Sequence, residues 1–124
     1  MKLTDTIEIT VSKYRGPRRS PLRVKEQVPA KIYGPLAVHR DVRVGLKQQW
    51  KVTHVATGLR ITGELTQKAA VAIAKELKDL PQWHEPTLGE GRTAANAAVF
   101  EALSKKVNEA MAFHVHGYAR EVVA

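Results

Sequence analysis

The spacing of the apolar residues changes near Thr66, and this change constrains the fold more than any other feature of the chain. Between residues 36 and 64, apolar and polar side chains alternate in three short runs, a pattern typical of half-buried strands. Beyond Thr66 the apolar residues recur at the spacing of one helix face: Ala70, Ile73, Ala74 and Leu77. We therefore expect an α+β fold, with an antiparallel sheet of three to four strands packed against two helices.

Turn residues and prolines divide the 124 residues into successive elements, and this length suits a single domain over residues 1–124. Period-two alternation predicts an N-terminal strand over Thr6–Tyr14. Pro17, Pro21 and Pro29 then forbid a regular helix, so we expect a basic loop there. The later elements are predicted in this order: basic loop 15–29, β-meander 36–64 (strands 36–44, 49–55 and 59–64), Thr66-capped helix 66–80, linker 81–92 and C-terminal helix 93–113.

Two features leave alternatives open. The C-terminal helix carries an apolar stripe at spacings of three, four and three residues: Phe100, Leu103, Val107 and Ala110. This stripe fits packing in the chain's own core, and it also fits a homodimer through helix 93–113. Trp83 in the linker is either a lid over the core or an exposed anchor for a protein partner.

The positive charge is concentrated in the first half of the chain. Twelve Lys and Arg lie between Lys13 and Arg60 with only Glu26 and Asp41 against them, a net charge of +10, whereas the remaining residues carry −2. Such a surface attracts polyanions, and nucleic acid is the commonest polyanion of a cytoplasm. The basic residues do not line one face of an amphipathic helix, which disfavours a membrane surface as the partner.

We expect a small non-catalytic nucleic-acid-binding protein, with double-stranded DNA rather than RNA as its partner. Docking would use the basic loop and the polar face of the sheet, through Arg15, Arg18, Arg19, Arg23, Lys25, Arg43, Lys51 and Arg60. His39 on that polar face would add a phosphate contact. Tyr14 and Tyr33 are the only aromatic residues nearby, which disfavours single strands bound by base stacking. The alternative is a phage- or plasmid-type interaction or inhibitor protein whose basic face binds an acidic protein surface.

The stretch from Trp50 to Leu77 resembles a known type of DNA-binding module. It contains W-x-V-x-x-x-x-T-G-x-R-I-T-G-x-L-T-x-x-A-A-x-A-I-A, and covers about a quarter of the chain. This strand, strand and helix order is similar to the three-stranded-sheet-plus-helix modules of plant ethylene-response factors and of the arm-site-binding domains of tyrosine integrases. In that family the sheet lies in the major groove. The resemblance implies DNA contacts from Arg43, Lys51, Thr53, Arg60 and Thr62, although Asp41 departs from the family's Arg-rich first strand.

Signatures of catalysis are missing from the sequence. The chain has no cysteine, which excludes disulfides, thiol catalysis and Cys-based metal sites. His114-Val115-His116 matches the metal-binding pair of rolling-circle nucleases and relaxases, but residues two apart on a helix point in different directions. We expect no enzyme activity, cofactor or metal. The first residues, MKLTDTIEITVSKY, are polar and acidic before they are apolar, so we expect no secretory signal and a cytoplasmic protein.

Overall fold

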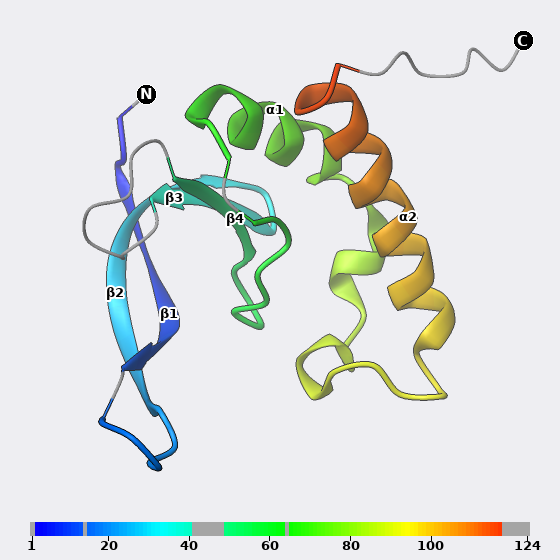
Figure 1. The fold of residues 1–124 in the computed structure, drawn as a ribbon. Helices are drawn as coiled ribbons and strands as arrows, with labels where there is room; N and C mark the ends of the chain where they lie inside the picture. The colour runs from blue at the N-terminus through cyan, green and yellow to red at the C-terminus, as the bar shows by residue number, and fades with distance from the viewer. Residues whose placement is uncertain (1, 14, 41–48, 64, 118–124) are drawn as a thin grey trace, which may run out of the picture.

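A computed structural model describes residues 2–13, 15–40, 49–63 and 65–117. One antiparallel sheet has the strand order β1-β2-β3-β4: β1 (Asp5–Lys13), β2 (Leu22–Tyr33), β3 (Leu36–Arg40) and β4 (Trp50–His54). The sheet is followed by α1 (Gln67–Leu77), two short 3₁₀ helices, η1 (Pro81–His84) and η2 (Leu88–Glu90), and α2 (Ala97–His114). This arrangement confirms the predicted α+β fold, a sheet combined with two helices (Figure 1).

Strand β2 replaces most of the predicted basic loop 15–29, so that prediction was wrong from residue 22 onward. The prolines exclude a helix but not a strand. Pro29 lies where β2 pairs with β1 alone, and a strand that pairs on one side tolerates a missing N–H. Apolar residues alternate with polar ones here, and Val28 and Ala30 are buried. At the end of β2, Tyr33 pairs with Leu36 across a two-residue turn.

The sheet is curved, and β3 is covered on both of its faces. In Figure 1, β2 bends strongly between the part that pairs with β1 and the part that pairs with β3. One face of β3 and β4 joins α1 in the larger core, which includes Leu36, Val38, Val52, Ala70, Ile73 and Leu77. The opposite face of β3 joins the β1–β2 hairpin in a smaller core of Ile7, Val28, Ala30 and Ala37. Consecutive residues of β3 are therefore buried, which period-two alternation does not predict.

The predicted third strand of the meander, 59–64, is not a regular strand. Two isolated bridges join this segment to β4: Thr53↔Arg60 and Trp50↔Leu65. Between the bridges β4 advances three residues and the other segment five, so the two segments do not match residue for residue and the ladder is interrupted. In the interruption the Thr62 hydroxyl accepts a hydrogen bond from the Val52 amide at 3.2 Å. Part of the predicted strand 36–44 lies outside the described residues.

Helix α1 begins where the sequence predicts. The Thr66 hydroxyl accepts a hydrogen bond from the Ala69 amide at 3.2 Å and so satisfies one of the free N–H groups of the first turn. The helix ends at Leu77, earlier than the predicted residue 80. The predicted linker 81–92 contains both 3₁₀ helices and buries Trp83 and Leu88.

Helix α2 begins later than the predicted residue 93, because Asn96 organises the chain before it into a turn. The Asn96 side chain accepts from the Thr93 amide at 2.7 Å and donates to the Gly91 carbonyl at 3.0 Å. Its apolar stripe contacts the chain's own core, in agreement with the core-packing alternative: Leu103 and Ala110 are buried, and Phe100 and Val107 pack against the same cluster.

Candidate nucleic-acid interface

Strands β1 and β2 form a two-stranded ribbon that extends beyond the rest of the sheet (Figure 1). Eight residue pairs, from Thr6↔Pro29 to Lys13↔Leu22, belong to these two strands alone. At roughly 3.4 Å per residue the ribbon is about 27 Å long. We call residues 6–29, which are the ribbon and the loop that closes it, the arm.

The distal half of the arm carries only positive charge. Between residues 9 and 25 there are six Lys and Arg and no Asp or Glu. Arg15, Arg18 and Arg19 are exposed in the closing loop, and Arg23 is exposed on β2. Among the described residues, no carboxylate lies within ion-pair distance of these four arginines. The structure therefore gathers four of the predicted site residues at one end of the molecule, with no carboxylate of the described ranges paired to them.

The closing loop has a defined backbone path. Arg18 has φ +64°, in the left-handed region that residues other than glycine adopt uncommonly. The Nε–H of Arg15 donates to the Ser20 carbonyl at 2.8 Å across the loop. These two features hold the loop arginines at the tip of the ribbon.

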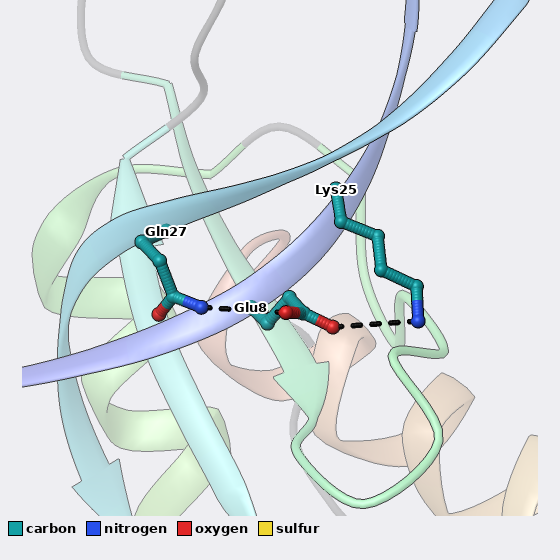
Figure 2. Close-up of polar contacts among 3 residues, drawn as sticks. All are labelled: Glu8, Lys25 and Gln27. Atoms are coloured by element: carbon teal, nitrogen blue, oxygen red, sulfur yellow. Dashed lines mark hydrogen bonds and ion pairs between the residues drawn. The ribbon is translucent and has the colours of Figure 1, made fainter.

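Nearer the body of the protein the charge of the arm is partly compensated (Figure 2). The Glu8 carboxylate on β1 faces two side chains of β2: the Lys25 ammonium lies 3.6 Å from one oxygen, and the Gln27 amide donates to the other at 3.4 Å. Glu8 is directly opposite Gln27 and diagonal to Lys25, so the three side chains share one face of the ribbon. Exposed ion pairs of this kind contribute at most about 1 kcal/mol, so Lys25 is held only weakly.

Lys51 on β4 does not share a sheet face with Arg23 and Lys25 of the arm. Lys51 is connected to Ala30 on β2 through a directly paired residue of β3, so Lys51 and Ala30 lie on the same face of the sheet. The odd-numbered residues of β2 point to the other face. Lys51 and Arg60 instead line a pocket of about 240 Å³ on the face that carries Ala30. The predicted docking residues therefore belong to two separate groups.

The polar face expected for the meander is covered by the β1–β2 hairpin. His39, Thr53 and Thr62 are only 2 %, 3 % and 4 % exposed. The Nδ1–H of His39 donates to the Arg40 carbonyl at 3.0 Å, and its Nε2 accepts from the Thr53 hydroxyl at 2.8 Å. These polar groups are satisfied inside the protein. These side chains are too deeply buried to reach the groove of a duplex, unlike the roles that alternation and the family resemblance imply for them.

Trp83 is a lid over the core, which decides between the two alternatives for this residue. Its ring stacks on the buried His54, with the ring centroids 5.4 Å apart. The Nε2–H of His54 donates to the Trp83 carbonyl at 2.9 Å, and its Nδ1 accepts from the Thr57 hydroxyl at 2.7 Å. Burial lowers the pKa of His54, because the interior disfavours a charged imidazole.

The two C-terminal histidines lie in different surroundings. His114 ends α2, and its Nε2 lies 3.1 Å from a Glu76 carboxylate oxygen on α1, which links the two helices. His116 follows the helix and is exposed. In the described ranges no three His, Cys, Asp or Glu side chains are grouped to hold a metal ion. No helix in the same ranges is long and apolar enough to cross a membrane.

Sequence reasoning missed β2, one of the two strands of the arm. The alternation of Val24, Val28 and Ala30 is the signal that identifies β2, but the prolines and charges between them mask it. Arg43, the remaining predicted site residue, lies outside the described residues. No family model, curated protein or solved structure significantly matches this chain.

Proposed function

We propose that the protein is a non-catalytic, cytoplasmic, double-stranded-DNA-binding protein that docks through the arm. The observation that carries this proposal is a two-stranded antiparallel ribbon with an exclusively basic distal half. The major groove of B-DNA, about 12 Å wide, admits a two-stranded ribbon. A ribbon about 27 Å long is long enough to lie along the groove while its tip reaches the flanking phosphates.

The chemistry of the exposed side chains supports a duplex rather than a single strand. Arginine matches both phosphate oxygens and the guanine edge in the major groove, and Arg15, Arg18, Arg19 and Arg23 are exposed together. Single-strand binding requires aromatic platforms on which bases stack. Tyr33 packs against the larger core instead of lying open beside the arm.

The proposal differs from the expected docking mode in the part of the sheet that it uses. The covered strands β3 and β4 present no open polar face, so the exposed arm takes over the role first given to the meander. Lys25 on the outer face of the ribbon then leaves its weak ion pair with Glu8 and contacts a DNA phosphate instead.

The test is fluorescence anisotropy with a labelled 20-base-pair DNA, a hairpin RNA and single strands at 50 and 200 mM salt. The arm variant combines Arg18→Asn, Arg19→Gln and Arg23→Gln; asparagine suits the left-handed backbone at position 18. If each arginine meets one phosphate, the slope of log K against log salt falls by about 2.7 in magnitude. The matched control is Lys68→Gln, Lys75→Gln, Lys105→Gln, which removes the same charge from exposed helix positions.

Tight duplex binding that the arm variant weakens, and the control leaves unchanged, supports the proposal. An equal loss in both variants would show that net charge alone attracts the DNA. Absence of binding at 50 mM salt would overturn the proposal and favour an acidic protein surface as the partner. Trp83→Ala does not separate these two partners, because Trp83 is buried and its loss damages the fold.

A further inference from the structure

A second cationic feature lies away from the arm's arginines, in the pocket between β1 and β4. Its volume is about 240 Å³. It is lined by Ile9 and Thr10 from β1, His39 from β3, Lys51 and Thr53 from β4, and Gly58 and Arg60 from the segment that follows. Within this described lining there is no carboxylate.

The strand register brings the two cations to one side of the sheet. Lys51 and Thr53 are two residues apart on β4 and therefore point to the same face. Arg60 is bridged directly opposite Thr53, which places Arg60 diagonal to Lys51. Diagonal neighbours are within reach of each other's long side chains. The described part of the chain holds no acidic partner within ion-pair distance of Arg60.

The floor of the pocket is polar and fixed in position. Thr53 and His39 are buried and hydrogen-bonded to each other at 2.8 Å. The Gly58 backbone, with φ +74°, forms part of the mouth, and the space where its side chain would lie is open. The mouth thus combines two long cationic side chains with a rigid base, which lowers the cost of ordering a bound anion.

We propose that this pocket binds a phosphate group. An Arg guanidinium and a Lys ammonium together match the oxygens and the charge of a phosphate, the guanidinium as a planar fork and the ammonium as a point charge. The group can come from a free phosphate monoester or from the diester backbone of a nucleic acid. The proposal does not rest on binding of DNA by the arm, because the pocket uses the other face of the sheet.

The test follows backbone amide and Arg side-chain NMR signals of the full chain during titration with inorganic phosphate. Sodium chloride at equal ionic strength is the reference, and dimethyl phosphate is the diester probe. We expect saturable shifts at Thr53, Gly58 and Arg60 with phosphate and none that saturate with chloride. Arg60→Gln should lower the phosphate affinity about tenfold or more, because it removes charge-assisted hydrogen bonds. Arg92→Gln, an exposed control, should leave it unchanged.

The proposal would be overturned if chloride caused the same shifts as phosphate. It would also be overturned if the Arg60→Gln variant had an unchanged phosphate affinity and an NMR spectrum typical of the folded protein. Saturation by inorganic phosphate alone identifies monoesters as the ligand, and saturation by dimethyl phosphate as well identifies the diester backbone; both support a phosphate site. The arm variant separates the two proposals: it should retain phosphate binding in the pocket even where it loses duplex binding.

Discussion

Replacing Trp83 tests whether this side chain supports the fold or presents a surface. The ring is 4 % exposed, is stacked on His54 and packs in the larger core. Its Nε1–H also donates to the Leu77 carbonyl at 2.7 Å, and this carbonyl belongs to the last turn of α1. Trp83 therefore joins β4, the end of α1 and η1, and its removal should affect all three elements.

The structure sets the size of the effect. Truncation of a buried Trp to Ala costs about 3–5 kcal/mol through lost burial and the cavity that remains. The Leu77 carbonyl loses the shorter of its two hydrogen bonds and keeps the one from the Leu80 amide at 3.2 Å. Together these effects bring the expected loss for Trp83→Ala to about 4–6 kcal/mol. Trp83→Phe keeps most of the ring and removes only the N–H donor, so we expect a loss of about 1–3 kcal/mol. The free energy of unfolding of a domain of this size is only about 5–15 kcal/mol, so the Ala variant is close to the point at which the protein no longer folds.

The assay is urea unfolding followed by circular dichroism at 222 nm, which does not depend on tryptophan fluorescence. Leu22→Ala serves as the control, because Leu22 is a large apolar residue that is 44 % exposed at the start of β2. The free energy of unfolding of this control should lie within about 0.5 kcal/mol of the wild-type value. The Phe variant keeps the experiment interpretable if the Ala variant does not fold. If the free energy of unfolding of both Trp83 variants lies within about 1 kcal/mol of the wild-type value, the reasoning is refuted, because removal of a buried side chain that covers the core costs more than this.

Two further predictions concern buried polar residues. Burial lowers the pKa of His54 below its usual 6.5, so the folded protein favours the neutral ring: its stabilising contribution is present above about pH 6.5 and is lost as the pH falls through the folded-state pKa. Urea midpoints between pH 7.5 and 5 should show a decline of up to about 1.4 kcal/mol per pH unit from this group, and His54→Gln should flatten it; equal slopes in both proteins would contradict this assignment. Asn96→Ala should destabilise the protein by about 2–3 kcal/mol, because the buried Asn96 side chain bonds the Thr93 amide and the Gly91 carbonyl and both hydrogen bonds are lost. In the same unfolding assay the exposed Asn108→Ala should be nearly neutral, and similar losses for both would argue against the role of Asn96.

The elements that the sequence predicts correctly are those whose signals are local. Thr66 marks the start of α1 because its hydroxyl bonds an amide three residues away, and no distant contact is needed. The strands at Thr6–Tyr14 and 49–55 show clear alternation and appear as β1 and β4. The apolar stripe of the C-terminal helix likewise predicts the side of α2 that packs in the core.

The wrong predictions concern pairing between segments. Prolines in 15–29 exclude a helix but carry no information on whether β1 lies alongside to pair with that segment. The run 59–64 alternates as a strand does, yet isolated bridges separated by unequal numbers of residues take the place of a regular ladder with β4. Strand propensity describes one segment, whereas a ladder depends on the match between two.

The sequence by itself determined the class of the fold, the start of α1, the positions of three of the four strands and the concentration of positive charge before residue 60. Those properties depend on neighbouring residues and on composition. Only the tertiary structure decided which side chains are accessible. The curved sheet covers His39 and Thr53 with the hairpin, and the strand register places Lys51 on the opposite face from Arg23 and Lys25. Burial is set by whatever packs against a face from elsewhere in the chain, so alternation alone identifies two faces but not which of them meets the solvent.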